Sequence, residues 1–425
     1  MRNATTLAVT LTLVNLLIAC GDRIPATPGS PGASPGSPTP TSSPSPTVTS
    51  AGFLHVLQHP WVMTYEIDPS GRLRPPVTQH VTRDLNLLAG EPSGRFVYGA
   101  HGGWPTTTPG DCSDLAIVTY SRDPRDGTLS PVSDVTLAKH PANCDSYYPG
   151  PARWIWLKGD ADRVHGLWMQ VSGYGHHVSY TYMSIAVAGD GRLGSSRKRS
   201  LYFGDYYGEV LVNPRTGVVY TAGPWIGGGG YPPGRGGLAA HVIGPDGTLD
   251  RTGWTNLCFA RTMEEYGFPR PLVSARGFVF ASCYSDFETL CAYQGLRLKP
   301  LYALDLDVDA AEAFVPSSEA EPALLAMNVT SSTGRAPSHE LRVFSMNAEG
   351  DLRPAYSEEL PDSLEGFQFH PSGRSLYTVD RASRLRAYAI GSDGRMEPAM
   401  QIDNAGGSMA ITLKDAQLQA QEAGQ

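Results

Sequence analysis

Acidic side chains recur just before, or at the start of, predicted inner strands and are the residues best suited to chemistry. They are Asp84, Asp145, Asp205, Glu264 and Glu365. If these strands converge on one axis, the carboxylates surround a single opening and offer the oxygen ligands that Ca²⁺ prefers. Each carboxylate could instead cap a local turn or remain solvated. A calcium site is therefore one interpretation of the pattern, and local capping is the other.

Aromatic side chains form the second candidate set. They are Trp61, Trp104, Tyr147, Tyr148, Trp225, Tyr231 and Tyr266, of which Trp104, Tyr147 and Trp225 are our candidate ligand contacts. Aromatic faces beside acids suit sugar or peptide ligands. The alternative is that these rings only cover the ends of the sheets.

Several function classes receive no support from the residues. The sequence contains no His-Glu-x-x-His and no Cys-x-x-Cys motif. The formal net charge is -8 and no basic run is present, so we expect no nucleic-acid partner.

Two turn motifs repeat along the chain and predict its fold. The first is a glycine turn followed by Leu or Met, at Gly71, Gly127, Gly191, Gly247, Gly350 and Gly394. The second is a Pro-Ser-Gly-Arg type turn that leads into an apolar strand, at residues 92–98 and 371–377. Together they predict a unit of four antiparallel strands, A to D, at intervals of about fifty residues, which is a propeller blade.

The first complete unit predicts strand A at Asp84–Ala89, B at Phe96–Ala100, C at Leu115–Tyr120 and D at Ser130–Leu137. The interval between Gly247 and Gly350 is about twice the others and predicts a hidden copy, which we place at Leu301–Leu306. Counting that copy gives seven units. The stretch between Leu306 and Ala323 is short, which leaves a missing strand open.

The two ends of the repeat array complement each other. Gly407–Leu413 resembles a lone strand A, whereas Phe53–Leu57 and Val62–Ile67 resemble strands B and C with no strand A before them. One blade shared by both termini would close the ring. The sequence therefore predicts an all-β, seven-bladed β-propeller over residues 51–414.

These repeats resemble the lactonase-like seven-bladed propellers, the group of 6-phosphogluconolactonase and the carboxymuconate-lactonising enzymes. The resemblance rests on the Pro-Ser-Gly-Arg turn and on runs such as Leu385–Ile390, and it spans Phe53 to Leu413. It implies His, Arg and acidic groups at the channel mouth of enzyme members. Here the stretches before the inner strands contain the acids without the histidines, so the residues do not decide whether the protein is an enzyme.

Strand order also predicts a working face. The tight A–B and C–D turns lie on one side of the ring, and the B–C and D–A connections lie on the other. The long insertions fall in the second class, at residues 101–114, 172–177, 224–237 and 283–300. We therefore expect ligands on this long-loop face.

Cysteine usage fits an oxidising compartment. The pair most compatible with the repeat is Cys112 with Cys144. Cys112 lies in a predicted B–C loop and Cys144 in the next D–A loop, so both fall on the long-loop face of one blade. Cys283 with Cys291 is the next candidate pair, and Cys258 is left over or competes.

The first twenty residues predict a lipoprotein signal peptide. An apolar run from Leu7 to Ile18 ends in the lipobox Leu17–Cys20, and Cys20 would accept the lipid. Residues 21–50 are rich in Pro, Ser, Gly and Thr and predict a disordered tether, and residues 415–425 form a C-terminal tail. Gly21 after the cysteine favours the outer membrane of a bacterial cell envelope.

We therefore expect a membrane-tethered, monomeric propeller that binds a small molecule, glycan or protein on its long-loop face. The alternative is a lactonase-like hydrolase or isomerase that acts on a lactone or sugar acid at the channel mouth.

Replacing Cys20 with Ala removes the thiol that would accept the lipid, so the protein should move from the membrane fraction to the soluble extracytoplasmic fraction. Fractionation and labelling with radioactive palmitate measure this in a bacterial host. Cys112→Ala is the matched control and should stay membrane-bound and labelled. Retention of the Cys20 variant with its label would contradict a lipid anchor there.

Overall fold

The computed structural model describes residues 51–413 except for 82–84, 92, 104–112, 140–151, 161, 173–176, 203–208, 214–216, 225–235, 244–248, 257–268, 284–288, 317–320, 332–336, 392–394 and 406. The predicted signal peptide, tether and C-terminal tail lie outside these residues. In the part of the chain that is described, no helix is long and apolar enough to cross a membrane.

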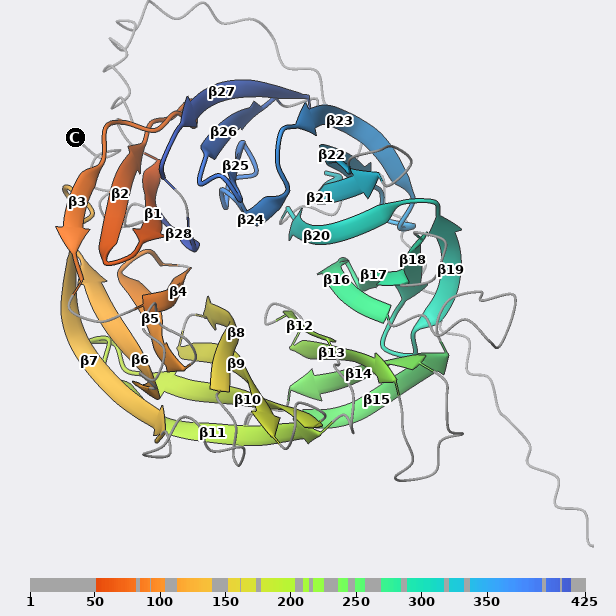
Figure 1. Ribbon diagram of the computed structural model, residues 1–425, viewed down its shortest axis with the longest axis horizontal. Helices are drawn as coiled ribbons and strands as arrows, with labels where there is room; N and C mark the ends of the chain where they lie inside the picture. The colour runs from red at the N-terminus through yellow and green to blue at the C-terminus, as the bar shows by residue number, and fades with distance from the viewer. Residues whose placement is uncertain are drawn as a thin grey trace, which may run out of the picture. The chain divides into compact units, whose positions relative to one another are not determined.

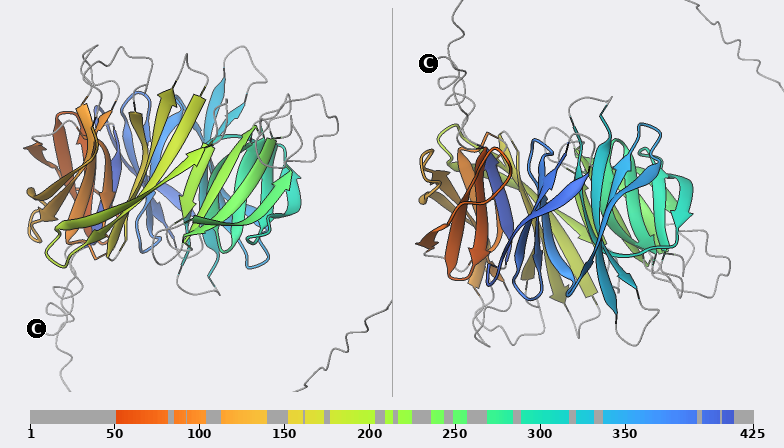
Figure 2. Two further views of the ribbon diagram at one scale, coloured as in Figure 1. Left: turned by 90° about the horizontal axis from the view of Figure 1, so that it is seen from below. Right: turned by 90° about the horizontal axis from the view of Figure 1, so that it is seen from above.

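The described residues form 28 strands in seven sheets, each of four antiparallel strands. The sheets stand around a common axis as blades, so the fold is a seven-bladed β-propeller (Figure 1). Within each blade the strands run between the two faces of the ring (Figure 2). This architecture confirms the predicted fold.

The blades are numbered here from the one that contains the first described strand, with strands A to D running outward. Blade 1 contains β28 (Met409–Leu413), β1 (Gly52–Gln58), β2 (Trp61–Ile67) and β3 (Val77–His80). Blade 2 contains β4 (Leu85–Gly90), β5 (Phe96–Gly103), β6 (Ser113–Arg122) and β7 (Leu129–Ala138). Blade 3 contains β8 (Ala152–Gly159), β9 (Arg163–Ser172), β10 (His177–Val187) and β11 (Leu193–Tyr202). Blade 4 contains β12 (Glu209–Asn213), β13 (Val218–Pro224), β14 (Gly236–Ile243) and β15 (Leu249–Asn256).

The other three blades follow the same order. Blade 5 contains β16 (Pro269–Ala275), β17 (Phe278–Cys283), β18 (Thr289–Gln294) and β19 (Lys299–Leu304). Blade 6 contains β20 (Asp307–Phe314), β21 (Ala323–Ser331), β22 (Ser338–Met346) and β23 (Leu352–Leu360). Blade 7 contains β24 (Leu364–Phe369), β25 (Ser375–Asp380), β26 (Leu385–Ile390) and β27 (Met396–Ile402).

The stretch between Leu306 and Ala323 holds a complete inner strand, β20, so blade 6 lacks nothing there. The hidden copy of the glycine turn lies at Gly295, whose φ of 68° closes the turn between β18 and β19. Our placement of that copy at Leu301–Leu306 was therefore too far along the chain. Most of this run belongs to β19, the outer strand that follows the turn.

Turn glycines contact the neighbouring blade. Gly127 and Gly191 have φ angles of 76° and 85°, which favour glycine. A Cβ at Gly127 would overlap the ring of Phe53 in blade 1, and one at Gly191 would overlap the ring of Phe96 in blade 2. These glycines are therefore required both by the turn and by the contact between blades.

Blade 1 closes the ring with strands from both ends of the described chain, as predicted. β28 pairs with β1 in antiparallel register, Ile411 opposite Leu54. His55 in β1 is fully buried, with its ring nitrogens 3.0 Å from the hydroxyls of Thr64 and Thr412. Burial, with a smaller contribution from Arg122, lowers the pKa of His55 to about 3. The imidazole is therefore neutral near pH 7, with one donor and one acceptor for the two hydroxyls.

Thr412→Val keeps the shape of the side chain but leaves one buried nitrogen of His55 without its partner. We expect the variant to lose about 1–3 kcal/mol of unfolding free energy, measured by urea denaturation. Thr78→Val, on exposed β3, is the matched control and should change stability by less than about 0.5 kcal/mol. Equal small losses in the two variants would contradict a role for His55 in closure.

Candidate functional site

Most residues predicted for the site fall outside the described residues. They are Cys20, Asp84, Asp145, Asp205, Glu264, Trp104, Tyr147, Trp225, Cys112 and Cys144. Glu365 is described and lies exposed at the second position of β24. The described residues contain no group of three or more His, Cys, Asp or Glu side chains arranged to hold a metal ion. A calcium site built from all five carboxylates thus stays a prediction.

Two further predicted groups are partly described. In the antiparallel register of β17 and β18, Cys283 lies opposite Thr289 and Cys291 lies opposite Ala281. The two cysteines are therefore diagonal neighbours on adjacent strands. Cys291 is a buried thiol, and burial raises its pKa to about 11. A disulfide between them stays a prediction. Among the predicted aromatic set, Trp61 is described: it is the first residue of β2 in blade 1 and is 43% exposed.

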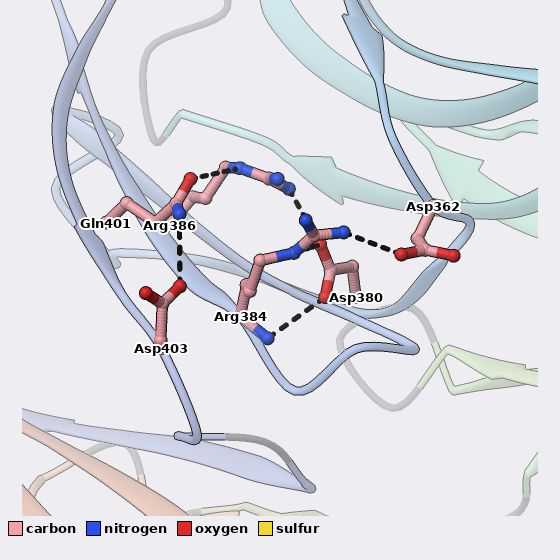
Figure 3. A network of polar contacts seen from close by, with 6 residues as sticks. All are labelled: Asp362, Asp380, Arg384, Arg386, Gln401 and Asp403. Carbon is pink, nitrogen blue, oxygen red and sulfur yellow. Dashed lines mark hydrogen bonds and ion pairs between the residues drawn. The ribbon is translucent and has the colours of Figure 1, made fainter.

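A buried carboxylate with two guanidinium groups lies on the long-loop face of blade 7 (Figure 3). Asp380, the last residue of β25, is 0% exposed. Arg384 Nε donates to its Oδ2 at 2.7 Å, and the backbone N–H of Arg384 donates to its Oδ1 at 2.9 Å. Arg386 Nη1 lies 3.1 Å from the same Oδ2. The short B–C connection 381–384 is thereby fixed against the end of β25.

The D–A connection that precedes β24 joins this group from the side of blade 6. Arg384 Nη2 donates to Asp362 Oδ2 at 2.6 Å, and the backbone N–H of Arg381 donates to the carbonyl of Ser363 at 3.0 Å. On the outer side, Arg386 Nε donates to Gln401. The 362–363 segment is therefore held by both side-chain and backbone contacts.

A second polar group lies in blade 6, where β20 begins and β21 ends. Asn328 is 0% exposed, and its Nδ2 donates to Ser363 Oγ at 2.9 Å and to Asp309 Oδ2 at 3.5 Å. Thr330 donates to the same carboxylate oxygen, and its hydroxyl lies 3.2 Å from His339 Nδ1. Two side chains of β21 thus contact Asp309, and Thr330 links this carboxylate to His339 on β22.

The two groups meet at consecutive residues, because Ser363 contacts Asn328 and Asp362 contacts Arg384. We call the continuous set the blade 6–7 network; its members are Asp309, Asn328, Thr330, His339, Asp362, Ser363, Asp380, Arg384, Arg386 and Gln401. It lies on the face to which the sequence assigned function.

The network offers acceptors and donors in fixed positions. Asn328 Oδ1 is buried and has no hydrogen-bond partner within the described residues, while its carboxamide is oriented by Asp309 and Ser363. A buried acceptor without a partner costs free energy, so a hydroxyl or a water that reaches it is bound favourably. Arg384 adds a planar donor suited to carboxylates.

The sequence contained one signal for this site that we did not use. Asp309 stands near the start of inner strand β20, as the predicted Glu365 does in β24. Asp309 was not among our candidate carboxylates. Asp380 and Arg384 gave no comparable signal, because the B–C connection of blade 7 is short and lacks an insertion.

Fold and site together define a seven-bladed β-propeller with a polar network on its long-loop face. No protein-family model matches the sequence, and the comparison with curated proteins finds no match.

Solved structures do resemble the chain in fold. The periplasmic gluconolactonase PpgL of Pseudomonas aeruginosa is similar with a TM-score of 0.54 and 16% identity, over 85% of this chain and 99% of that one. A functionally unknown protein from Desulfotomaculum acetoxidans is similar with a TM-score of 0.53 and 12% identity, over 86% of this chain and 100% of that one. At these identities the likeness establishes the propeller fold alone.

Asp380→Asn removes the charged partner of Arg386 and leaves Arg384 with Asp362 alone, and we expect a loss of about 3–5 kcal/mol of unfolding free energy. Asp362→Asn removes a carboxylate whose side chain is 43% exposed and should cost less than about 1 kcal/mol. Urea denaturation of both variants measures the difference. Losses of similar size would contradict the assignment of Asp380 as the central counter-charge.

Proposed function

We propose that this protein is an extracytoplasmic propeller that binds a small polyhydroxylated ligand on its long-loop face, at the blade 6–7 network. The observation that carries the proposal is the continuous chain of contacts from Asp309 through Asn328 and Ser363 to Asp362 and Arg384. Its location is argued from the lipobox at Cys20, through which the chain would be tethered to a bacterial membrane.

The donor and acceptor pattern favours a ligand with several hydroxyl groups. Asp309 and the buried Asn328 supply acceptors, and Thr330 and the buried Ser363 supply hydroxyls that can donate or accept. These side chains already contact one another, so little side-chain freedom is lost when a ligand binds. A similar fold in a periplasmic gluconolactonase supports sugar-derived compounds as the first class to test.

Hydrolysis of a lactone is the second candidate function. It is favoured by the contact of His339 with Thr330, which in turn donates to Asp309, because this arrangement links an imidazole to a carboxylate through a hydroxyl. General acid–base catalysis requires such groups within hydrogen-bond reach of substrate. Release of acid from glucono-δ-lactone, above its spontaneous rate, is the measurement that separates an enzyme from a binding protein.

Binding of gluconate, glucitol and glucono-δ-lactone to the full-length protein in detergent should raise the melting temperature by about 3 °C or more at saturation for at least one compound. Asp309→Asn keeps the shape of the side chain but removes its charge, so it should reduce this shift by at least about half. A differential scanning fluorimetry titration measures both effects.

Asp351→Asn is the matched control, because it lies in the same blade at the turn between β22 and β23, on the opposite face. It should leave the ligand-dependent shift unchanged. No shift with any of the three compounds would overturn a polyhydroxylated ligand, and an equal loss in both variants would overturn the site.

A further inference from the structure

Within the blade 6–7 network, the charged group formed by Asp380, Arg384 and Arg386 has more positive than negative charge. Asp380 supplies one negative charge against the two guanidinium groups of Arg384 and Arg386. The side chain of Arg386 is 9% exposed, and its Nη1 has no hydrogen bond within the described residues although it lies close to Asp380. This triad has a net charge of +1, with the side chain of Arg384 22% exposed, and favours a further anion nearby.

Asp362 supplies that anion from the solvent side. Its carboxylate is 43% exposed and contacts Arg384 Nη2, whereas the carboxylate of Asp380 is fully buried beneath Arg384 (Figure 3). Ion pairs with an exposed partner contribute little to stability, so the contact with Asp362 is replaceable. The contact with Asp380 keeps the guanidinium of Arg384 in place when Asp362 leaves.

From this arrangement we infer that Arg384 anchors a carboxylate-binding subsite, and that Asp362 occupies the position of the ligand's carboxylate when no ligand is bound. The inference rests on the proposed function and narrows its ligand class to hydroxylated carboxylic acids. Ser363 follows Asp362 directly and leads to Asn328, so hydroxyl contacts lie next to the carboxylate contact. A sugar acid carries both groups on one molecule.

The inference makes Asp362 a competitor of the ligand for Arg384. Replacing Asp362 should therefore have the opposite effect on affinity to replacing a residue that contacts the ligand. Removing its charge should strengthen the binding of an acid and leave the binding of a neutral polyol unchanged. A residue that merely supports the fold, or that contacts the ligand directly, would weaken binding when replaced.

Isothermal titration calorimetry of the full-length protein with gluconate and with glucitol tests this, because the two probes have the same carbon chain and differ at the carboxylate. We expect gluconate to bind at least about tenfold more tightly than glucitol. Raising the salt concentration should weaken the binding of gluconate alone. Asp362→Asn should tighten gluconate binding about threefold or more, with glucitol unchanged.

Glu397→Gln is the matched control, since it removes an exposed acid from outer strand β27 of the same blade and should change neither affinity. Equal affinities for gluconate and glucitol would overturn the carboxylate subsite while leaving the proposed function intact. Weaker gluconate binding by Asp362→Asn would overturn the competitor role. Failure of both probes and of the lactone to bind would overturn the proposed function itself.

Discussion

The propeller depends on close contacts between a turn glycine in one blade and an aromatic ring in the blade before it. Gly127 contacts Phe53, Gly191 contacts Phe96 and Gly350 contacts Phe278, each where a Cβ would overlap the ring. The same repeated contact joins blade 1 to 2, 2 to 3 and 5 to 6. At these three junctions the contact restricts how one blade packs against the next, and the repeated strand order brings connections of the same type to one face.

The sequence was informative wherever structure is local and repeated. Glycine turns and alternating strands specified four-stranded units, and the incomplete ends at Phe53 and Leu413 specified how the ring closes. The hidden glycine turn was misplaced because Gly295 is preceded by Gln294, whereas Asp precedes the glycine in four of the six copies that we identified. The repeat was recognised from copies that share the typical motif. The atypical turn at Gly295 was located only from the register of β18 and β19.

The candidate site was predicted less completely, because its contacts join residues that are far apart in sequence. Asn328 meets Ser363 across two blades, and no spacing rule connects them. Asp380 is surrounded by arginines that stand four and six residues later, yet only the bend after β25 turns both toward it. The loops in the sequence indicate the face on which the candidate site lies, whereas the polar network on that face depends on how strands align across a junction.

Closure of blade 1 has a consequence for the order of folding. The inner strand of this blade, β28, is the last strand of the ring to be synthesised, while its partner β1 is the first. Until Met409–Leu413 emerges, β1 has an unpaired edge, and the buried residues Leu54 and Val56 have no inner neighbour to cover them. The native ring therefore cannot close before β28 has been synthesised.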